Sequence, residues 1–251
     1  MILGKHALVT GGGTGVGRAI ALALAEAGVS VTICGRRKAK LEAVAGENAR
    51  IFPIAADVTD EAAMIGLYTE AEELRGPFDI VVANAGGAES SPAHKTSLAD
   101  WQRALDLNLT GSFLTVKPAL GGMTKRKAGR IVFVASTAGL KGYAYVAPYV
   151  AAKHGVVGLM RALATETVRS GVTVNAVCPG FTDTELMRDS VARIVEKTGR
   201  THDDALVEFT RQNPQGRLVA PAEVAAAVAF LCSGAASGIN GATLTVAGGE
   251  I

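Results

Sequence analysis

Aromatic residues, cysteine, histidine, net charge and long apolar runs are all scarce in this chain, and each shortage excludes a class of protein. Aromatics make up only 5% of the 251 residues, so the 49% of hydrophobic residues are mostly small and aliphatic. A net charge of +2 gives no electrostatic reason to expect nucleic acid or a membrane surface as a partner. No run of 18 uncharged apolar residues occurs, so we expect no membrane-spanning helix.

The three cysteines predict neither a disulfide nor a metal site. Cys34, Cys178 and Cys232 are odd in number, far apart and embedded in apolar segments, which is typical of buried reduced thiols. The four histidines lack the spacing of metal ligands, so we expect no metal. No signal-peptide pattern follows Met1, and we therefore expect a cytoplasmic protein.

Short apolar runs alternate with longer helical stretches along the chain. Strands are predicted at 6–10, 29–34, 50–55, 78–83, 130–135, 172–177 and 243–246, and helices at 15–27, 61–74, 98–123, 147–170 and 221–232. The long helix at 98–123 is expected to bend where Pro118 removes a donor. This alternation favours an α/β fold with a doubly wound parallel sheet, in one domain spanning 1–251.

One segment interrupts the alternation. Residues 183–217 are richer in charge and contain the turn signal Asn213-Pro214-Gln215-Gly216. Because an insertion of this length in a compact domain is usually functional, we expect it to be a helical lid over a substrate pocket.

A glycine-rich segment follows the first predicted strand and opens the first helix. It reads Thr10-Gly11-Gly12-Gly13-Thr14-Gly15-Val16-Gly17 and does not match the G-x-G-x-x-G fingerprint in any register. The physical logic is nevertheless the same, because glycine lets the backbone approach a pyrophosphate and the helix N-terminus meets the negative charge. We therefore predict a dinucleotide site at Gly11, Thr14, Gly15, Val16 and Gly17, although plain turns also contain such runs.

The end of the second strand bears on which nicotinamide dinucleotide is bound. It reads Cys34-Gly35-Arg36-Arg37-Lys38, with no carboxylate for a ribose 2′-hydroxyl and two guanidinium groups for a 2′-phosphate. This favours NADP(H), with NAD(H) as the alternative. The alternative for the arginines themselves is that they only solvate a helix start.

Tyr149 and Lys153 are four residues apart on a predicted helix, so they lie on one face. A lysine ammonium beside a phenol lowers the pKa of the phenol and makes it a usable proton donor near neutral pH. Ser136, thirteen residues before Tyr149, lies at a strand end, from which its hydroxyl would bind the same substrate oxygen.

Taken together, these motifs resemble the short-chain dehydrogenase/reductase family over nearly the whole chain. The matching pieces, in the order of the family, are Thr10-Gly11-x-x-x-Gly15-x-Gly17, Asp57-Val58, Asn84-Ala85-Gly86, Asn108, Ser136, Tyr149-x-x-x-Lys153 and Pro179-Gly180. Two positions depart from the usual pattern: Ala83, where many relatives have asparagine, and Ala247, where relatives often have aspartate. The resemblance implies a Rossmann-type sheet and a homotetramer.

The resemblance also implies catalytic roles. Tyr149 is expected to be the general acid in reduction, with Lys153 lowering its pKa and binding the nicotinamide ribose. Ser136 is expected to polarise the carbonyl, and Asn108 to hold a helix kink and a water in a proton relay. Tyr143 and Tyr145 have no lysine four residues on and are expected to line the pocket or an interface.

The remaining motif residues are implied to bind the cofactor. Asp57 and Val58 would contact the adenine, although Asp57 alone would also suit a cap on the following turn. The segment Asn84-Ala85-Gly86 would line the cofactor channel, and Thr184, after Pro179 and Gly180, would reach the carboxamide or phosphate side of the nicotinamide.

The substrate is less well defined by the sequence. The pocket is expected from 88–96, 140–146 and the lid; its apolar residues are Tyr143, Tyr145, Leu186, Met187 and Phe209, and its basic residues are Lys95, Lys141, Arg188, Arg193, Lys197 and Arg200. An apolar pocket with a basic mouth suits an acyl group on coenzyme A or acyl carrier protein, although the basic residues also suit a solvated helix face.

The chain looks most like 3-oxoacyl thioester and polyketide ketoreductases and 3-hydroxyacyl dehydrogenases. We therefore expect reversible reduction of a 3-oxoacyl thioester. The alternatives are a dehydrogenase or reductase of a free 3-hydroxy acid, alcohol or aryl ketone, and a non-catalytic nucleotide-binding scaffold.

Overall fold

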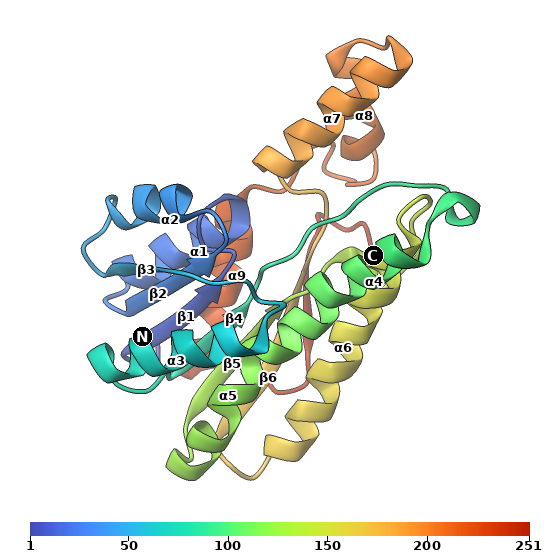
Figure 1. Cartoon of the computed structure of the whole chain (residues 1–251). Helices are drawn as coiled ribbons and strands as arrows, with labels where there is room; N and C mark the ends of the chain where they lie inside the picture. The colour runs from blue at the N-terminus through green and yellow to red at the C-terminus, as the bar shows by residue number, and fades with distance from the viewer.

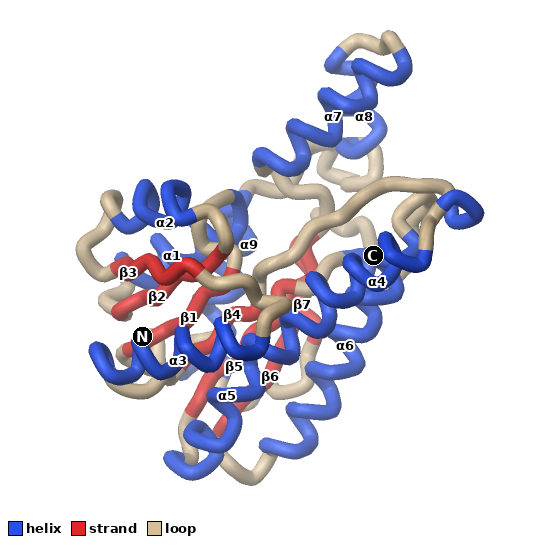
Figure 2. The backbone as a smooth tube through the Cα atoms, viewed as in Figure 1, coloured by secondary structure: helices blue, strands red, loops and turns tan.

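A seven-stranded parallel sheet organises the chain (Figures 1 and 2). The computed structural model describes residues 1–251, except for the side chain of Lys197. The strands are β1 (His6–Thr10), β2 (Ser30–Gly35), β3 (Ile51–Ala55), β4 (Ile80–Ala83), β5 (Gly129–Val134), β6 (Val172–Pro179) and β7 (Thr243–Val246). Their order is β3-β2-β1-β4-β5-β6-β7. Strands β2 and β3 are added on one side of β1 and strands β4 to β7 on the other, so the strand order reverses between β1 and β4.

Helices cover both faces of the sheet. They are α1 (Gly15–Glu26), α2 (Lys38–Ala45), α3 (Glu61–Arg75), α4 (Leu98–Leu105), α5 (Gly111–Arg126), α6 (Ala147–Thr167), α7 (Glu185–Thr198), α8 (His202–Thr210) and α9 (Pro221–Leu231). Helices α1, α2 and α9 share one hydrophobic cluster with the sheet, and α3, α5 and α6 share the other. Because both faces are covered, the central strands β4 and β5 are buried at every position. The predicted doubly wound α/β fold is confirmed.

The long predicted helix is interrupted before Pro118, and the bend expected at Pro118 itself stays a prediction. Pro118 lies inside α5, and the interruption is a π-helical turn, η2 (Asp106–Thr110). The side-chain amide of Asn108 explains the interruption, because it donates to the carbonyl of Ala104 on the preceding turn and also to that of Gly87 in another segment. Helix α2 was not predicted, because its eight residues are short and largely charged.

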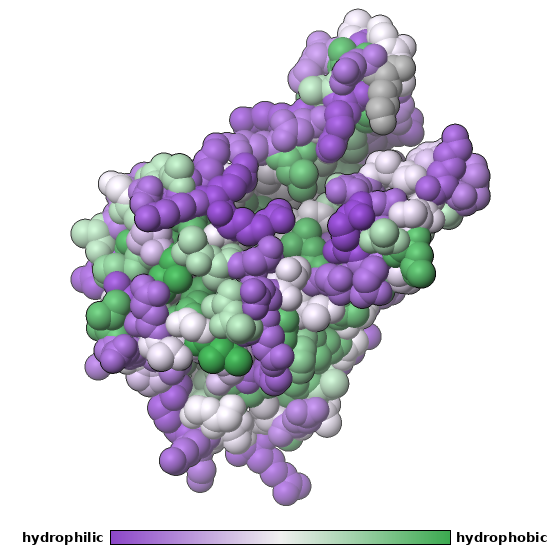
Figure 3. All heavy atoms as spheres, in the orientation of Figure 1, coloured by the Kyte–Doolittle hydropathy of each residue, from purple (hydrophilic) through white to green (hydrophobic). Residues whose placement is uncertain are grey.

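Residues 183–217 form a helical arm made of α7 and α8 (Figure 1). The arm projects beyond the carboxyl ends of the strands, and α7 ends at Gly199, whose φ of 69° suits glycine. Figure 3 shows hydrophobic residues at the foot of the arm, where it faces the body of the molecule. The helical insertion is therefore present where the sequence predicted it.

Among the residues that the structure describes, no helix combines the length and apolar character needed to cross a bilayer.

Candidate active site

The glycine turn lies where the strand order reverses, which is the usual ligand crevice of such sheets. Gly11 has a φ of 67°, and its backbone N–H donates to the carbonyl of Cys34 at the end of β2 over 2.8 Å. A Cβ at Gly17 would come within 2.2 Å of the Gly11 carbonyl oxygen. Only glycine therefore permits this close contact between the turn and the first turn of α1.

The N-terminus of α1 is open to an anion. Thr14 is its N-cap, yet its side chain makes no capping hydrogen bond, and the first turn contains no acidic residue. The free backbone N–H groups of a helix start attract phosphate. This open cap, together with the tightly folded glycine turn, fits the pyrophosphate of a dinucleotide.

Thr184 joins the arm to this turn. A Cβ built on Gly15 would lie 3.1 Å from Thr184 Cγ2, so Thr184 lies beside the phosphate end of the predicted site. Close by, Lys40 Nζ of α2 is 3.1 Å from Glu185 Oε1 of α7. The start of the arm thus crosses the groove at the glycine turn.

Arg36 and Arg37 follow β2 and are exposed. Arg37 is the N-cap of α2, so it does lie at a helix start, as the alternative interpretation of the arginines expected. Its side chain makes no capping hydrogen bond. The ion pairs in this region belong to Lys38 and Lys40, and neither arginine joins one with a described side chain. Both guanidinium groups therefore remain available to an anion.

Asp57 caps its own turn, as the simpler interpretation expected. Its Oδ1 accepts from the backbone N–H of Thr59 at 3.0 Å and from its hydroxyl at 2.9 Å. The backbone bond is the main reason that the pKa of Asp57 is lowered, and Arg36 adds a smaller effect. The Val58 side chain is buried in the core against Gly111, so any contact with adenine would use its backbone.

Thr10 connects β1 to the segment after β4. Its hydroxyl accepts from the backbone N–H groups of Asn84 and Ala85 at 3.0 and 3.1 Å, and Asn84 Nδ2 donates to the Thr10 carbonyl at 2.8 Å. A Cβ at Gly86 would meet Asn108 Oδ1 at 2.7 Å and lie 3.5 Å from Lys153 Nζ. The structure thus brings Gly86, Asn108 and Lys153 together.

Asn108 is fully buried and its amide is saturated by backbone groups. Oδ1 accepts from Gly87 N–H at 3.1 Å, while Nδ2 donates to the carbonyls of Gly87 and Ala104, each at 3.0 Å. The Asn108 carbonyl accepts from the Ser112 hydroxyl at 2.8 Å. The side chain therefore fixes the π turn to the loop after β4.

Tyr149 and Lys153 lie one turn apart at the start of α6. Lys153 is buried, its Nζ is 5.6 Å from the centre of the Tyr149 ring, and it donates to the Val134 carbonyl at 2.9 Å. Burial lowers the pKa of Lys153 from 10.5 to about 8.

The expected lowering of the Tyr149 pKa by Lys153 is not found in this structure. Burial raises the pKa of Tyr149, the hydrogen bond from Ser136 partly offsets that rise, and the Cys178 thiol adds to it. Lys153 contributes little because its ammonium points to a backbone carbonyl at the end of β5. The phenol therefore keeps its proton at neutral pH.

Ser136 is at the end of β5, within hydrogen-bonding reach of Tyr149, and its hydroxyl accepts from Ala138 N–H at 3.1 Å. Cys178 of β6 is fully buried nearby, and burial raises the pKa of its thiol to about 11. It is therefore an inert thiol, and Ser136, Tyr149 and Lys153 form the polar centre of this region.

Three of the six residues predicted to form a basic mouth pair with carboxylates, whereas Lys95 and Arg193 form no ion pair with a described side chain. Lys141, Arg188 and Arg200 each pair with a carboxylate, of Glu250, Asp183 and Glu208 respectively. The side chain of Lys197 lies outside the described part of the chain. The basic residues therefore give little support to binding of a phosphorylated carrier.

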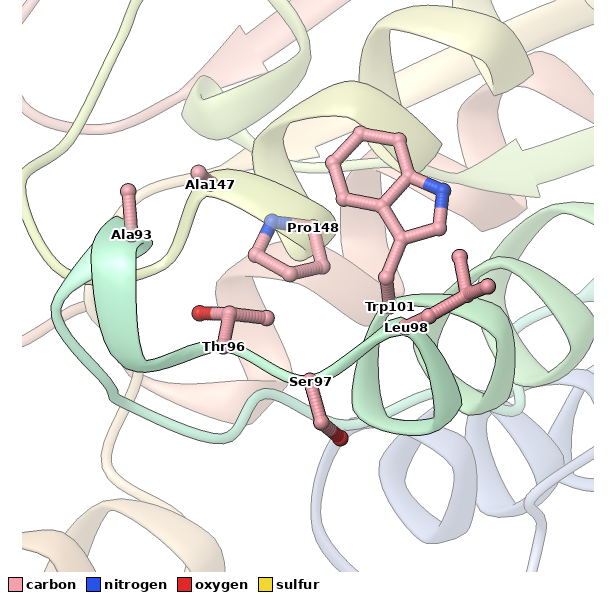
Figure 4. Close-up of a pocket in the computed structure, with 7 residues that line it drawn as sticks. All are labelled: Ala93, Thr96, Ser97, Leu98, Trp101, Ala147 and Pro148. Atoms are coloured by element: carbon pink, nitrogen blue, oxygen red, sulfur yellow. The ribbon is translucent and has the colours of Figure 1, made fainter.

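A surface cavity of about 330 Å³ lies beside the start of α6. Figure 4 shows Trp101 and Pro148 facing each other across it; the complete lining is Ala93, Thr96, Ser97, Leu98, Trp101, Ala147 and Pro148. None of the predicted catalytic or cofactor-binding residues lines this cavity, although Ala93 and Thr96 belong to the segment 88–96 that was predicted to line the substrate pocket.

Sequence reasoning missed two groups that shape the site. Thr10 was read only as part of the glycine motif, although its hydroxyl joins β1 to the Asn84 segment. Glu250 was not singled out, although its carboxylate accepts a hydrogen bond from the Tyr143 hydroxyl. No local signal marks Glu250, because it meets Tyr143 only through the fold.

A family model described as "short chain dehydrogenase" matches residues 5–194. The chain belongs to the short-chain dehydrogenase/reductase family. It is thus an oxidoreductase, and the family uses NAD(H) or NADP(H) as its hydride carrier. Strand order, the glycine turn and the Ser136, Tyr149 and Lys153 cluster agree with this assignment.

Three similar proteins illustrate the breadth of the family. The chain is 38% identical to D-beta-hydroxybutyrate dehydrogenase of Cupriavidus necator, over 100% of this chain and 99% of that protein. It is 36% identical to acetoacetyl-CoA reductase of Shinella zoogloeoides, over 99% of each. A solved variant of actinorhodin polyketide ketoreductase with NADPH is 36% identical and covers 98% of this chain and 97% of its own, with a TM-score of 0.94.

Proposed function

We propose that this short-chain dehydrogenase/reductase reduces a 3-oxoacyl thioester to the 3-hydroxyacyl form, reversibly, with NADPH as the hydride donor. The observation that carries the proposal is the position of the Tyr149 phenol, within reach of the Ser136 hydroxyl and one helical turn from the buried Lys153. Similar proteins named as acetoacetyl-CoA reductase and polyketide ketoreductase support the thioester as substrate.

In this mechanism the Ser136 hydroxyl donates a hydrogen bond to the carbonyl oxygen and holds it beside Tyr149. Bound NADPH supplies a hydride to the carbonyl carbon. Tyr149 transfers its phenolic proton to the oxygen, which becomes the hydroxyl group of the product. Burial raises the pKa of Tyr149 in this structure, so the phenol is protonated but weakly acidic, and proton transfer requires help from neighbouring groups.

We assign to Lys153 the stabilisation of the phenolate left on Tyr149, for which its ammonium must turn from the Val134 carbonyl towards the phenol. Asn108 positions this pair by fixing the loop after β4, next to which Lys153 lies. As the family resemblance implies, we also assign to Asn108 a relay water for returning a proton to Lys153.

The two arginines after β2 support NADP(H) over NAD(H). Arg36 and Arg37 are exposed and have no described ion-pair partner, and no carboxylate follows β2 to bind a 2′-hydroxyl. Thr14, Gly15, Val16 and Gly17 would hold the pyrophosphate. Ala85, Gly86, Pro179, Gly180 and Thr184 would line the remaining groove.

The rest of the assignment concerns the whole assembly. We take 1–251 as one domain, with the arm 183–217 as a lid over the substrate, in a cytoplasmic homotetramer. A second candidate, reduction of a free 3-oxo acid, is favoured by the likeness to D-beta-hydroxybutyrate dehydrogenase.

The test is nicotinamide absorbance during turnover, with NADPH and NADH each combined with a 3-oxobutanoyl thioester and with free 3-oxobutanoate. Rapid oxidation of NADPH by the thioester is the expected result. Preference for the free acid would move the substrate to the second candidate, and preference for NADH would overturn the role of Arg36 and Arg37. Turnover of neither substrate would favour a non-catalytic protein.

A further inference from the structure

Glu250 places a buried carboxylate in the site that the chemistry above does not use. Its side chain is only 1% exposed. Oε1 accepts from the Tyr143 hydroxyl and lies 3.1 Å from Lys141 Nζ, while Oε2 is equally enclosed and has no partner among the described atoms. A half-satisfied buried carboxylate is costly and therefore calls for a physical explanation.

The C-terminal segment is held firmly in this position. Gly248 has a φ of 62°, and a Cβ there would come within 1.9 Å of Asn213 Oδ1 at the foot of the arm. Gly249, with a φ of 94°, follows it against Pro214. These glycines let the chain turn inward, so that Glu250 Oε2 lies 2.8 Å from where a Cβ of Gly180 would be.

Glu250 belongs to a wall that runs from the catalytic serine to the arm. We call Thr137, Lys141, Tyr143, Phe181 and Glu250 the Glu250 wall. The Tyr143 hydroxyl is 2.6 Å from Thr137 Oγ1, the residue after Ser136, and its ring packs edge-on against Phe181 at 5.7 Å. Phe181 in turn packs on Phe209 of α8 at 5.1 Å.

The charges on this wall cancel. The Lys141 side chain is 31% exposed and its ammonium has three donors, of which Glu250 occupies one. Without Glu250, the ammonium would attract a substrate carboxylate; with Glu250, the pair carries no net charge and the unpartnered Oε2 repels a second carboxylate.

We propose that Glu250 is a specificity-determining residue of the substrate pocket, which neutralises Lys141 and so makes the enzyme prefer uncharged carbonyl compounds to free oxo acids. This inference rests on the proposed function and narrows it to substrates without a carboxylate near the reacting carbonyl. It also explains why Lys141 alone does not make the pocket a receptor for acids.

The test compares the parent with Glu250→Gln, in which the amide oxygen still accepts from Tyr143 but the charge is gone. The substrates are the uncharged N-acetylcysteamine thioester of 3-oxobutanoate and free 3-oxobutanoate, with NADPH. We expect kcat/KM for the free acid to rise about tenfold, as an unmasked ammonium near the substrate would give. We expect kcat/KM for the thioester to stay within about threefold, as for any change that leaves the transition-state contacts in place.

Two further variants sharpen the test. In the double variant Lys141→Met with Glu250→Gln, the gain for the free acid should disappear, because no ammonium remains. Glu61→Gln, which breaks the exposed pair with Lys117, should leave both substrates as in the parent. An unchanged preference in Glu250→Gln, or an equal loss on both substrates, would overturn the inference and leave Glu250 a purely structural residue.

A binding measurement separates this inference from the proposed function. In a thermal shift experiment, 3-hydroxybutanoate should stabilise Glu250→Gln more than the parent, and this readout needs no turnover. If the parent turns over no carbonyl compound but the shift differs as expected, the proposed function fails and the specificity role of Glu250 stands. Equal shifts would refute that role.

Discussion

The catalytic residues and the Glu250 wall, which meet where Thr137 follows Ser136, are held in different ways. Asn108 and Lys153 are buried and bonded to backbone groups of Gly87, Ala104 and Val134. Lys141, Tyr143 and Glu250 are held to one another through side chains only. Backbone partners cannot be lost by substitution, whereas side-chain partners can.

This difference separates chemistry from specificity. Asn108 and Lys153 are fixed by backbone groups of the sheet and of the π turn, so their positions are set before the substrate binds. Preorganised catalysis requires such fixed positions. A wall made of side-chain contacts and an arm made of exposed ion pairs can change while the fold is retained. Four predictions test this contrast.

The largest effect is expected at Tyr149. Tyr149→Phe removes the proton donor and should lower kcat about 10³-fold, equivalent to about 4 kcal/mol of barrier. Affinity for NADPH, measured by fluorescence titration, should change little. The matched control is Tyr145→Phe, an exposed tyrosine on the adjoining loop, which should retain parental kcat. Comparable losses in the two variants would remove Tyr149 from the mechanism.

The next effect is the pH dependence of stability caused by Lys153. Its pKa is lowered from 10.5 to about 8 on folding, so the unfolded chain binds one more proton between these pH values. Burying the Lys153 ammonium lowers the free energy of unfolding by its full amount below pH 8. This destabilisation disappears as the pH rises towards 10.5.

Relative to Lys153→Met, the parent should therefore gain about 1.4 kcal/mol of unfolding free energy per pH unit across that window. Urea denaturation of both proteins at several pH values measures it. A difference that stays constant from pH 8 to pH 10 would show that folding does not lower the pKa of Lys153.

A smaller loss is expected when Asn108 is removed. Asn108→Ala leaves the N–H and carbonyl of Gly87 without their partner and should cost about 2 kcal/mol of stability, since unsatisfied buried groups are costly. Gln102→Ala, an exposed amide on α4, is the control. Equal unfolding midpoints in urea for the two variants would contradict the account.

The smallest effect is expected on the arm. Arg200→Ala breaks an exposed pair with Glu208 and should change the unfolding free energy by less than about 0.5 kcal/mol, as surface ion pairs usually do. Thermal unfolding of this variant beside Asn108→Ala measures the contrast. If Arg200→Ala lost more unfolding free energy than Asn108→Ala, the proposed contrast between the arm and the catalytic residues would be refuted.

The sequence predicted what depends on local pattern and motif order. The seven strands, the arm and the grouping of Ser136, Tyr149 and Lys153 follow from periodicity and from the i,i+4 spacing on α6. A local rule predicted a bend at Pro118, whereas the interruption at 106–110 coincides with the kink that the family resemblance implied at Asn108.

Features that depend on distant contacts were not predictable from one sequence. The pKa of Tyr149 is raised instead of lowered because the fold buries the phenol, while the Lys153 ammonium donates to a carbonyl of β5. Glu250 meets Lys141 across more than 100 residues, and that pairing neutralises a residue assigned to the basic mouth.

The central claim is that Ser136 and Tyr149 hold the carbonyl oxygen while the Glu250 wall contacts the rest of the substrate. Its most direct test is a crystal structure of Tyr149→Phe with NADPH and a 3-oxobutanoyl thioester. The account predicts the carbonyl oxygen within hydrogen-bonding distance of Ser136 Oγ, with the adjoining acyl group against Tyr143. A carbonyl directed away from Ser136, with the acyl group remote from Tyr143, would contradict it.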